Sequence, residues 1–495
     1  MTVALLSAQC ALADVKLPVL LSDGMVLQRG LPIHIWGKAG PGESVRVALN
    51  KQSKTTTADF VGRWHIYLAP EAAGGPFELT VQGTNLIVLH DVLIGDVWVA
   101  SGQSNMEFPM EGWNGTPKDA AAEIPKANLP TVHFLQVSRA YSDHPLDDIA
   151  PATWKACTPD SVRRFSAVAY FFAKEITAHE KVPIGVIESD WGGTVAEAWT
   201  SLDGLSSNPG LMPIFANRAH MSDEQMEVEL VAPHEDELKK QARAKGQPEP
   251  IFAWHPDPHS WVPAALYNAM ISPLTPFAIR GVIWYQGESN SALERTQHYG
   301  PLFETLIRDW RNHWAIGEFP FLYVQIANFK SNELEDWAPV RDAQRKALEL
   351  VNTAMAVTID IGDPDGVHPT DKRDVGQRLA LAARAISYGE HFEYSGPLFR
   401  ELTREDHSLR IWFDHAEGAL KPGPHGWCGF EVAGRDGHFV GASAHVDGST
   451  IVVSSSNIET PSQARYAWEN SPECPFFNQA GLPASPFATS LALFH

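Results

Sequence analysis

The stretch GDVWVASGQSNMEF, residues 95–108, runs from an apolar segment into a turn of small polar residues. Its first part, residues 96–100, is rich in β-branched and aromatic side chains, which is typical of a buried β-strand. Turn-forming and polar residues follow the strand directly: Ser101, Gly102, Gln103, Ser104 and Asn105. The stretch is therefore either an ordinary surface turn or a turn that presents a serine nucleophile at the end of a strand.

Apolar strand candidates alternate with amphipathic helix candidates between residues 94 and 388. The strand candidates are LIGDVWVA (93–100), VPIGVIES (182–189), IRGVIWYQG (279–287), PFLYVQIA (320–327) and AMAVTIDIG (354–362). Helical periodicity is found at 168–180, 301–314 and 375–386. Pro301 suits the first position of the second helix. This alternation predicts an α/β fold whose largely parallel sheet is covered by helices on both faces.

Short β-like segments separated by Gly, Pro and Asn turns flank this region on both sides. We expect residues 14–93 to form an N-terminal β-sandwich, and residues 396–495 to form a β-rich, jelly-roll-like region that packs against it. The α/β domain between them is expected to span residues 94–395, with an insertion at 212–260. The insertion is charged and is predicted to be a helix followed by an irregular loop, either solvated or lid-like.

The N-terminus predicts export. Residues 1–13 are apolar and end in Ala-Leu-Ala, which resembles the cleavage site of a secretory signal peptide. The usual positive charge at the start is missing, so we interpret them as the remnant of such a signal and expect a periplasmic or extracellular protein. Three cysteines follow the signal remnant that contains Cys10. We expect Cys428 and Cys474 either to form a disulfide after export or to be buried thiols like Cys157.

Composition excludes several classes of partner. The formal net charge of −21 repels phosphate backbones and anionic lipids, so we expect neither nucleic acid nor a membrane surface as a partner. No run outside residues 1–13 is long and apolar enough to span a bilayer. Some tryptophans lie in loop-like contexts, where most are expected to pack in the core and a few to stack on sugars. These are Trp113, Trp191, Trp254, Trp261, Trp337 and Trp427.

Four predicted strands end in clusters of small and polar residues. The clusters are residues 101–105, 188–194, 284–290 and 363–369. The carboxyl ends of parallel strands meet at one edge of a sheet, and ligands of such folds bind there. We therefore expect the four clusters to be neighbours in space.

Asp365 and His368 have the spacing of an oriented general base. A turn can place the carboxylate of Asp365 on one imidazole nitrogen and leave the other nitrogen to face a hydroxyl, such as that of Ser104. Taken alone, Ser104 is equally a turn serine, and His368 before Pro369 a helix-entry residue. Their occurrence at successive strand ends favours catalysis by a serine nucleophile.

The second and third clusters contain donors for an oxyanion. Gly192 and Gly193 let backbone N–H groups approach a bound group closely. Together with the N–H of Ser104 and the side-chain amide of Gln286, they are candidates for an oxyanion hole. Taken singly, the glycine pair is an ordinary turn, and Gln286 and Glu288 are ordinary helix-capping residues.

Two other kinds of site fit the sequence less well. Asp360, Asp363, Asp365 and His368 are possible metal ligands, but no second histidine lies at ligand spacing and no calcium loop is present. We therefore expect no metal and no cofactor. A lipase-type α/β-hydrolase also fits poorly, because Ser-Gly-Gln-Ser-Asn lacks the Gly-x-Ser-x-Gly pattern.

The clusters resemble those of the SGNH (GDSL-like) hydrolase superfamily, and most closely those of sialate O-acetylesterase-like carbohydrate esterases. The resemblance covers nearly the whole chain after residue 13. Its segments stand in the expected order: MVLQRGLPIHIWGKAGPGESV, DVLIGDVWVASGQSNMEF, VPIGVIESDWGGTVAEAW, LYNAMISPLTPFAIRGVIWYQGESN, DIGDPDGVHPTDKRDVGQRLAL and RYAWENSPECPFFNQAGLPASPF.

The resemblance implies a flavodoxin-like three-layer sandwich and a set of site residues. Ser104 is implied as nucleophile, His368 as general base and Asp365 as its orienting partner. The implied oxyanion donors and substrate contacts are Ser104 N–H, Gly192 or Gly193, Gln286, Asn105 and Glu288. The chain departs from the wider superfamily in the third cluster, where Gln-Gly-Glu stands in place of an asparagine, and Asp363 remains an alternative to Asp365.

The implied reaction is removal of acetyl groups from sugar hydroxyls by a carboxylic ester hydrolase. The expected substrates are acetylated hemicelluloses, such as xylan or xyloglucan, or O-acetylated sialic acid. Arg341 is a basic residue that could meet the carboxylate of a sialic acid, although its context favours a solvated residue in the first turn of a helix. The alternative is a carbohydrate-binding protein built on an inactive hydrolase scaffold. The sequence does not indicate an oligomeric state.

Overall fold

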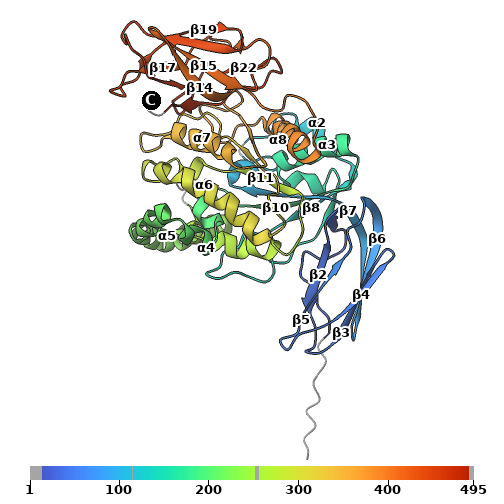
Figure 1. The fold of residues 1–495 in the computed structure, drawn as a ribbon. Helices are drawn as coiled ribbons and strands as arrows, with labels where there is room; N and C mark the ends of the chain where they lie inside the picture. Colours follow the sequence, from blue (N-terminus) through green and yellow to red (C-terminus); the bar gives the residue numbers. More distant parts are fainter. Residues whose placement is uncertain (1–13, 114, 251–255, 490–495) are drawn as a thin grey trace, which may run out of the picture.

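A central sheet of mainly parallel strands connects the parts of the molecule (Figure 1). The structure is a computed structural model that describes residues 14–113, 115–250 and 256–489. The predicted signal remnant at 1–13 and Trp254 lie outside the described residues. No helix in the described part of the chain is both long and apolar enough to cross a lipid bilayer.

Within the described residues, six strands of the α/β domain run parallel. In spatial order they are β8 (Leu129–Gln136), β10 (Ile184–Asp190), β7 (Leu86–Gly102), β11 (Gly281–Tyr285), β12 (Phe321–Val324) and β13 (Thr353–Ala356). The short antiparallel strand β9 (Lys155–Cys157) lies beyond β8. Without β8 and β9, the order is the 2-1-3-4-5 of flavodoxin-like sheets, with its switch point between β7 and β11. The prediction of a largely parallel α/β sheet is confirmed.

Strand β7 belongs to two sheets. It is 17 residues long, and its first half pairs with β6 (Gly74–Gln82) of the N-terminal region. From Asp96 onward it pairs with β10 instead, and from Trp98 also with β11. The boundary expected at residues 93–94 therefore falls inside a continuous strand that joins the N-terminal region to the α/β domain.

Helices cover both faces of the sheet. Trp98 of β7 is in register with Gly281, whereas Trp284 lies three positions further along β11, so these two indoles point to opposite faces. Trp98 contacts Phe172 of α3 (Ala167–Glu180), and Trp284 contacts Trp310 of α6 (Leu293–Trp314). Helix α8 (Lys372–Tyr388) packs on α3, while α4 (Leu202–Ser207) and α7 (Trp337–Lys346) pack on α6.

The predicted helices are present, but one of them begins earlier than expected. Helix α6 begins at Leu293, so Pro301 lies inside it rather than at its first position. The start of the helix is set by the turn after β11, not by the proline.

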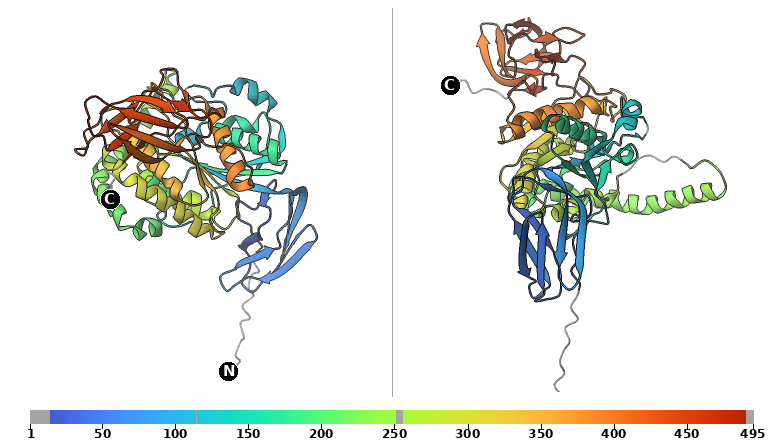
Figure 2. Two further views of the ribbon diagram at one scale, coloured as in Figure 1. Left: turned by 45° about the horizontal axis from the view of Figure 1, so that its top comes forward. Right: turned by 90° about the vertical axis from the view of Figure 1, so that its right-hand side faces the viewer.

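The predicted inserted helix is α5 (Met212–Ala244), which Figure 2 shows reaching away from the rest of the molecule. The predicted lid role of the insertion stays a prediction. The short helices α1 (Ser104–Glu107) and α2 (Ala120–Glu123) follow β7.

Mainly antiparallel β-structure flanks the α/β domain. The other N-terminal strands are β1 (Val26–Gln28), β2 (Ile33–Lys38), β3 (Ser44–Leu49), β4 (Gln52–Thr57) and β5 (Arg63–Leu68). The C-terminal strands are β14 (Leu398–Glu405), β15 (Ser408–Asp414), β16 (Lys421–Pro422), β17 (Phe430–Ala433), β18 (Val440–Gly441), β19 (Ser443–Asp447), β20 (Thr450–Ser454), β21 (Gln463–Tyr466), β22 (Phe476–Phe477) and β23 (Phe487–Ala488). Alternating burial along β3 and β5 packs one face of each strand inward.

The two β-regions lie at opposite ends of the described chain (Figures 1 and 2). The expected packing of the C-terminal region on the N-terminal one is therefore wrong. The reason is where each is attached: the N-terminal region continues into the start of β7, whereas the C-terminal region follows α8 and packs near α7. The α/β domain separates them.

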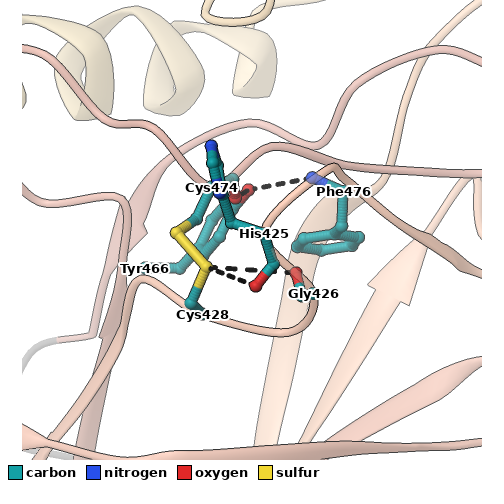
Figure 3. Close-up of a disulfide and its surroundings, with 6 residues drawn as sticks. All are labelled: His425, Gly426, Cys428, Tyr466, Cys474 and Phe476. Atoms are coloured by element: carbon teal, nitrogen blue, oxygen red, sulfur yellow. Dashed lines mark hydrogen bonds between the residues drawn. A yellow bond between two sulfur atoms is a disulfide. The ribbon is translucent and has the colours of Figure 1, made fainter.

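A disulfide joins Cys428 to Cys474 across a sequence separation of 46 residues (Figure 3). The hydroxyl of Tyr466 donates to the carbonyl oxygen of Cys474 at 2.7 Å beside it. Cys157 is a buried free thiol, and burial raises its pKa to about 12. Of the two alternatives left by the sequence, the structure has the disulfide.

Candidate active site

The four polar clusters meet at the carboxyl edge of the sheet, as predicted. Gly102 at the end of β7 is in register with Asp190 of β10 and with Tyr285 of β11. The side-chain amide of Asn105 donates to Oε1 of Glu288 at 2.6 Å and to the carbonyl oxygen of Val367 at 3.0 Å. One amide thus connects the first, third and last clusters.

The end of β7 needs a glycine. Gly102 has a φ of +138°, and a Cβ there would lie 2.1 Å from the carbonyl oxygen of Tyr285. The next residue, Gln103, donates its N–H to the same oxygen at 2.9 Å and accepts from the N–H of Ser289 at 3.2 Å. This close approach between β7 and β11 turns the chain into α1, whose first residue is Ser104.

The two serines of the turn have different environments. Ser101 is still part of β7, is fully buried, and its hydroxyl has no partner among the described residues. Ser104 is 8% exposed, and neither its hydroxyl nor its N–H donates to another described residue. Of the two serines, Ser104 is therefore the one whose hydroxyl and N–H are both free among the described residues at this edge of the sheet.

Gly192 lies directly against Ser104. A Cβ on Gly192 would lie 3.2 Å from Cβ of Ser104 and 3.0 Å from Oε2 of Glu107. However, the N–H of Gly192 already donates to Oε2 of Glu107 at 2.7 Å. Gly193 has a φ of +74°, and its N–H has no acceptor in the described part of the chain. Of the two glycines, Gly193 has the free donor.

Gln286 is buried and its amide is fully used. It donates to Oδ1 of Asn290 at 2.6 Å and to the carbonyl oxygen of Thr194 at 3.2 Å. Both amide hydrogens are thus occupied within the protein. In this structure Gln286 ties the loop after β11 to the loop after β10. It has no free donor for an oxyanion, which differs from the prediction made from the sequence.

His368 is half-buried beside two aromatic rings. Its ring centroid lies 5.6 Å from that of Trp113 and 6.0 Å from that of Phe108. Neither ring nitrogen makes a hydrogen bond within the described residues; catalytic hydrogen bonds often tighten only in the substrate complex. Burial and, to a lesser extent, the charge of Lys372 lower the pKa of His368 to about 4. The imidazole is therefore neutral at pH 7.

Asp365 lies in the loop before His368 but does not contact it. Its side chain is exposed, and its N–H donates to Oδ1 of Asp363 at 3.0 Å. Asp360 forms a two-bond ion pair with Arg378, with both distances 2.7 Å, so it is occupied elsewhere. The orienting role of Asp365 stays a prediction, with Asp363 as the alternative.

Sequence reasoning missed Lys372. This lysine is fully buried at the start of α8, and its Nζ donates to Oδ1 of Asn105 at 2.5 Å. Burial lowers its pKa to about 7, while the buried carboxylate of Glu288 acts in the opposite direction. Its spacing with Val375 and Leu379 was the available signal, because it places Lys372 on the inner face of the helix.

A group of acidic side chains lies at the end of β10. Glu188 and Asp190 are buried, and burial raises the pKa of both carboxyl groups, with repulsion from Glu107 acting in the same direction. Glu107, which accepts from Gly192, forms an ion pair with Arg139. The raised pKa of these carboxyl groups and the ion pair of Glu107 both act against negative charge in this part of the site, which suits a site where an oxyanion develops.

Arg341 has neither of the roles considered from the sequence. It is fully buried, and its guanidinium donates to four carbonyl oxygens. These belong to Ile326, Ala327, Glu469 and Asn470, at 2.7–2.9 Å. Arg341 therefore ties the C-terminal region to the α/β domain and cannot meet a substrate carboxylate.

Three of the tryptophans considered as sugar-stacking residues surround the site. Trp113 is 46% exposed beside His368. Trp191 is half-buried below the guanidinium of Arg139, 5.7 Å from the ring centroid. Trp261 donates its indole N–H to the carbonyl oxygen of Gly193 at 2.6 Å. Trp337 is buried in the core.

Comparison with known proteins identifies relatives over nearly the whole chain. A family model described as "Carbohydrate esterase, sialic acid-specific acetylesterase" matches residues 244–385. The chain is 31% identical to mouse (Mus musculus) sialate O-acetylesterase over 423 residues, which is 77% of this chain and 75% of the mouse protein. It is 29% identical to the human (Homo sapiens) sialate O-acetylesterase over 521 residues, covering 94% of this chain and 91% of the human protein.

A solved structure shares both sequence and fold. It is a carbohydrate acetylesterase from Xanthomonas citri, 37% identical, with a TM-score of 0.82. The match covers 96% of this chain and 100% of that one. The similarity therefore includes the α/β domain and both flanking regions.

Proposed function

Because the chain belongs to the sialate O-acetylesterase family of carbohydrate esterases, we propose that it removes acetyl groups from sugar hydroxyls with Ser104 as nucleophile. The observation that carries the proposal is the position of Ser104. It begins α1 at the carboxyl end of β7, with Gly192 against its Cβ and a neutral histidine in the loop that Asn105 contacts. The strand order around it supports an SGNH-type three-layer fold, which has its site at the β7–β11 switch point.

The proposed reaction proceeds through an acetyl-enzyme. Ser104 Oγ attacks the acetyl carbonyl carbon while His368 accepts the hydroxyl proton. The sugar oxygen leaves and takes that proton from His368. Water then attacks the acetyl-enzyme while His368 accepts one of its protons, and His368 returns that proton to Ser104 Oγ as acetate leaves. No redox partner and no further reactant besides water is required.

The oxyanion formed in each step requires donors. The free N–H groups of Ser104 and Gly193 are the proposed donors, and Gly192 and Gln286 hold the surrounding loops in place. Loss of one such donor typically costs about 3–4 kcal/mol in the transition state. Asp365 is proposed to reach His368 when substrate orders the loop.

The proposed substrate is an acetylated glycan, and the site favours a neutral one. Trp113 and Trp191 present aromatic surface beside Ser104 and His368, which suits a sugar ring. The guanidinium of Arg139, which lies over Trp191, is already paired with Glu107, so this group offers no net positive charge to a sialate carboxylate. We therefore propose acetylated hemicelluloses, such as xylan and xyloglucan, as the preferred substrates and O-acetylated sialic acid as the less favoured one.

We also propose that the protein is exported. The Cys428–Cys474 disulfide supports an oxidising compartment, because such bonds are rare in the cytosol.

Acetate release from a panel of acetylated xylan, acetylated xyloglucan oligosaccharides and O-acetylated sialosides tests the proposal. We expect release by the wild-type enzyme and none by Ser104→Ala. A fluorophosphonate probe should label the wild-type protein at Ser104. A folded protein that binds these glycans without releasing acetate or taking up the probe would instead be the inactive binding protein.

A further inference from the structure

A buried lysine lies next to the site without a role in the reaction described above. Lys372 is the first residue of α8, four positions after His368, and its side chain is fully buried. Its ammonium lies 4.9 Å from the ring centroid of Phe108 and 5.5 Å from that of Tyr285. Lysine is almost never fully buried unless it is paired, because an ammonium is strongly hydrated.

The partner of this lysine is an amide that lies between two charges. Oδ1 of Asn105 accepts from Lys372 at 2.5 Å, and its NH2 group donates to Glu288 at 2.6 Å and to the Val367 carbonyl oxygen at 3.0 Å. Only one orientation of the amide satisfies all three contacts. The carbonyl oxygen must face the ammonium, and the NH2 group must face the carboxylate. The two buried charges therefore fix the amide.

The fixed amide ties the two reacting residues together. Asn105 directly follows Ser104, and Val367 directly precedes His368, although Asn105 and Val367 are 262 positions apart in the sequence. Without Lys372, the Asn105 oxygen loses its partner among the described residues, and the amide is held only by the two bonds of its NH2 group. The bond to Val367 is then held less rigidly, and the loop that holds His368 has more room to move relative to α1.

We propose that Lys372 is a positioning residue for acyl transfer, which acts through Asn105 to set the distance between Ser104 and His368. It does not touch the reacting atoms. The inference rests on the proposed roles of Ser104 and His368. Three other ionisable groups face Lys372, namely Glu288 after β11, Tyr285 at the end of β11 and His368 in the loop before α8.

The variant Lys372→Met tests this role, because methionine keeps an apolar, unbranched side chain. We expect kcat for an aryl acetate to fall by about 100-fold, the usual effect of a misplaced catalytic group, while KM changes by less than about 3-fold. The acid limb of the kcat/KM profile should move to higher pH, because a positive charge near His368 has been removed. This shift follows from the loss of the charge alone, so positioning is tested by kcat on the pH plateau above the limb.

Two controls separate positioning from folding. Lys372→Met alone leaves the Glu288 carboxylate buried and unpaired, so the double variant K372M/E288Q is measured beside it. We expect the double variant to regain thermal stability but not kcat. Lys118→Met removes an exposed lysine that pairs with Asp371 at 2.7 Å beside the same helix start, and it should keep the wild-type kcat.

A wild-type kcat on the pH plateau in folded Lys372→Met overturns the inference. A double variant whose kcat returns together with its stability also overturns it. Ser104→Ala is assayed in parallel. If Ser104→Ala is inactive and Lys372→Met is fully active, only the positioning role fails; if Ser104→Ala stays active, the proposed function fails as well.

Discussion

As the proposed general base, His368 should set the acid limit of activity, and the environment of its ring predicts this limit at an unusually low pH. The imidazole is packed beside Trp113 and Phe108, and burial together with the charge of Lys372 lowers its pKa from 6.5 to about 4. A general base acts only when it is unprotonated, so activity is retained above this pKa and is lost as the pH falls through it.

The expected difference is large at pH 5. A histidine with a pKa of 6.5 is unprotonated in about 3% of molecules at this pH, whereas one with a pKa of about 4 is unprotonated in about 90%. We therefore expect kcat/KM at pH 5 to stay near 90% of its plateau, about 30-fold above the value for an ordinary histidine. The relevant quantity is kcat/KM because it reports the free enzyme.

Acetate released from an aryl acetate, quantified after quenching, gives kcat/KM between about pH 3.5 and pH 8. Circular dichroism at each pH verifies that the protein is folded. An acid limb centred near pH 6.5 in folded enzyme refutes the buried, neutral environment assigned to His368. A limb that does not depend on His368, as judged from the residual activity of His368→Ala, refutes its role as the base.

The remaining predictions concern stability and substrate recognition. Arg341→Met leaves buried carbonyl oxygens unpaired, so the free energy of unfolding should fall by about 3–5 kcal/mol in chemical denaturation; an unchanged midpoint contradicts the tie between the two regions. The double variant Cys428→Ser and Cys474→Ser removes a disulfide that spans 46 residues, so the free energy of unfolding should fall by about 2–4 kcal/mol. The loss should be detected first as faster hydrogen exchange in the C-terminal strands. Trp113→Ala should raise KM for acetylated oligosaccharides about 5–10-fold but leave KM for an aryl acetate unchanged; equal effects on both substrates argue against sugar stacking.

The strands and most helices could be predicted because their signals are local. Apolar runs such as those at 182–189 and 279–287 carry their own period and their own turn residues. The start of α6 and the position of the C-terminal region could not be predicted from the sequence, because both depend on contacts between residues that are distant in the chain. Pro301 suggested a helix start that the turn after β11 overrides, and nothing local places the C-terminal strands on the far side of the α/β domain.

The candidate site divides in the same way. Ser104 and His368 could be located because each follows a strand-like run in a parallel fold. The roles of Gln286 and Arg341 could not, because their hydrogen-bond partners are carbonyl and amide groups far away in the sequence. Lys372 was missed because a lysine in a first helical turn is normally exposed.

An acetyl group on Ser104 is the most direct test of the central claim. The enzyme is mixed with acetylated xyloglucan oligosaccharide or an aryl acetate, quenched in acid during turnover, digested and analysed by mass spectrometry. We predict one added acetyl group on the peptide that contains Ser104, lost when substrate is exhausted and absent from Ser104→Ala. Rapid acetate release with no modification at Ser104, or with the acetyl group on another residue, contradicts the account.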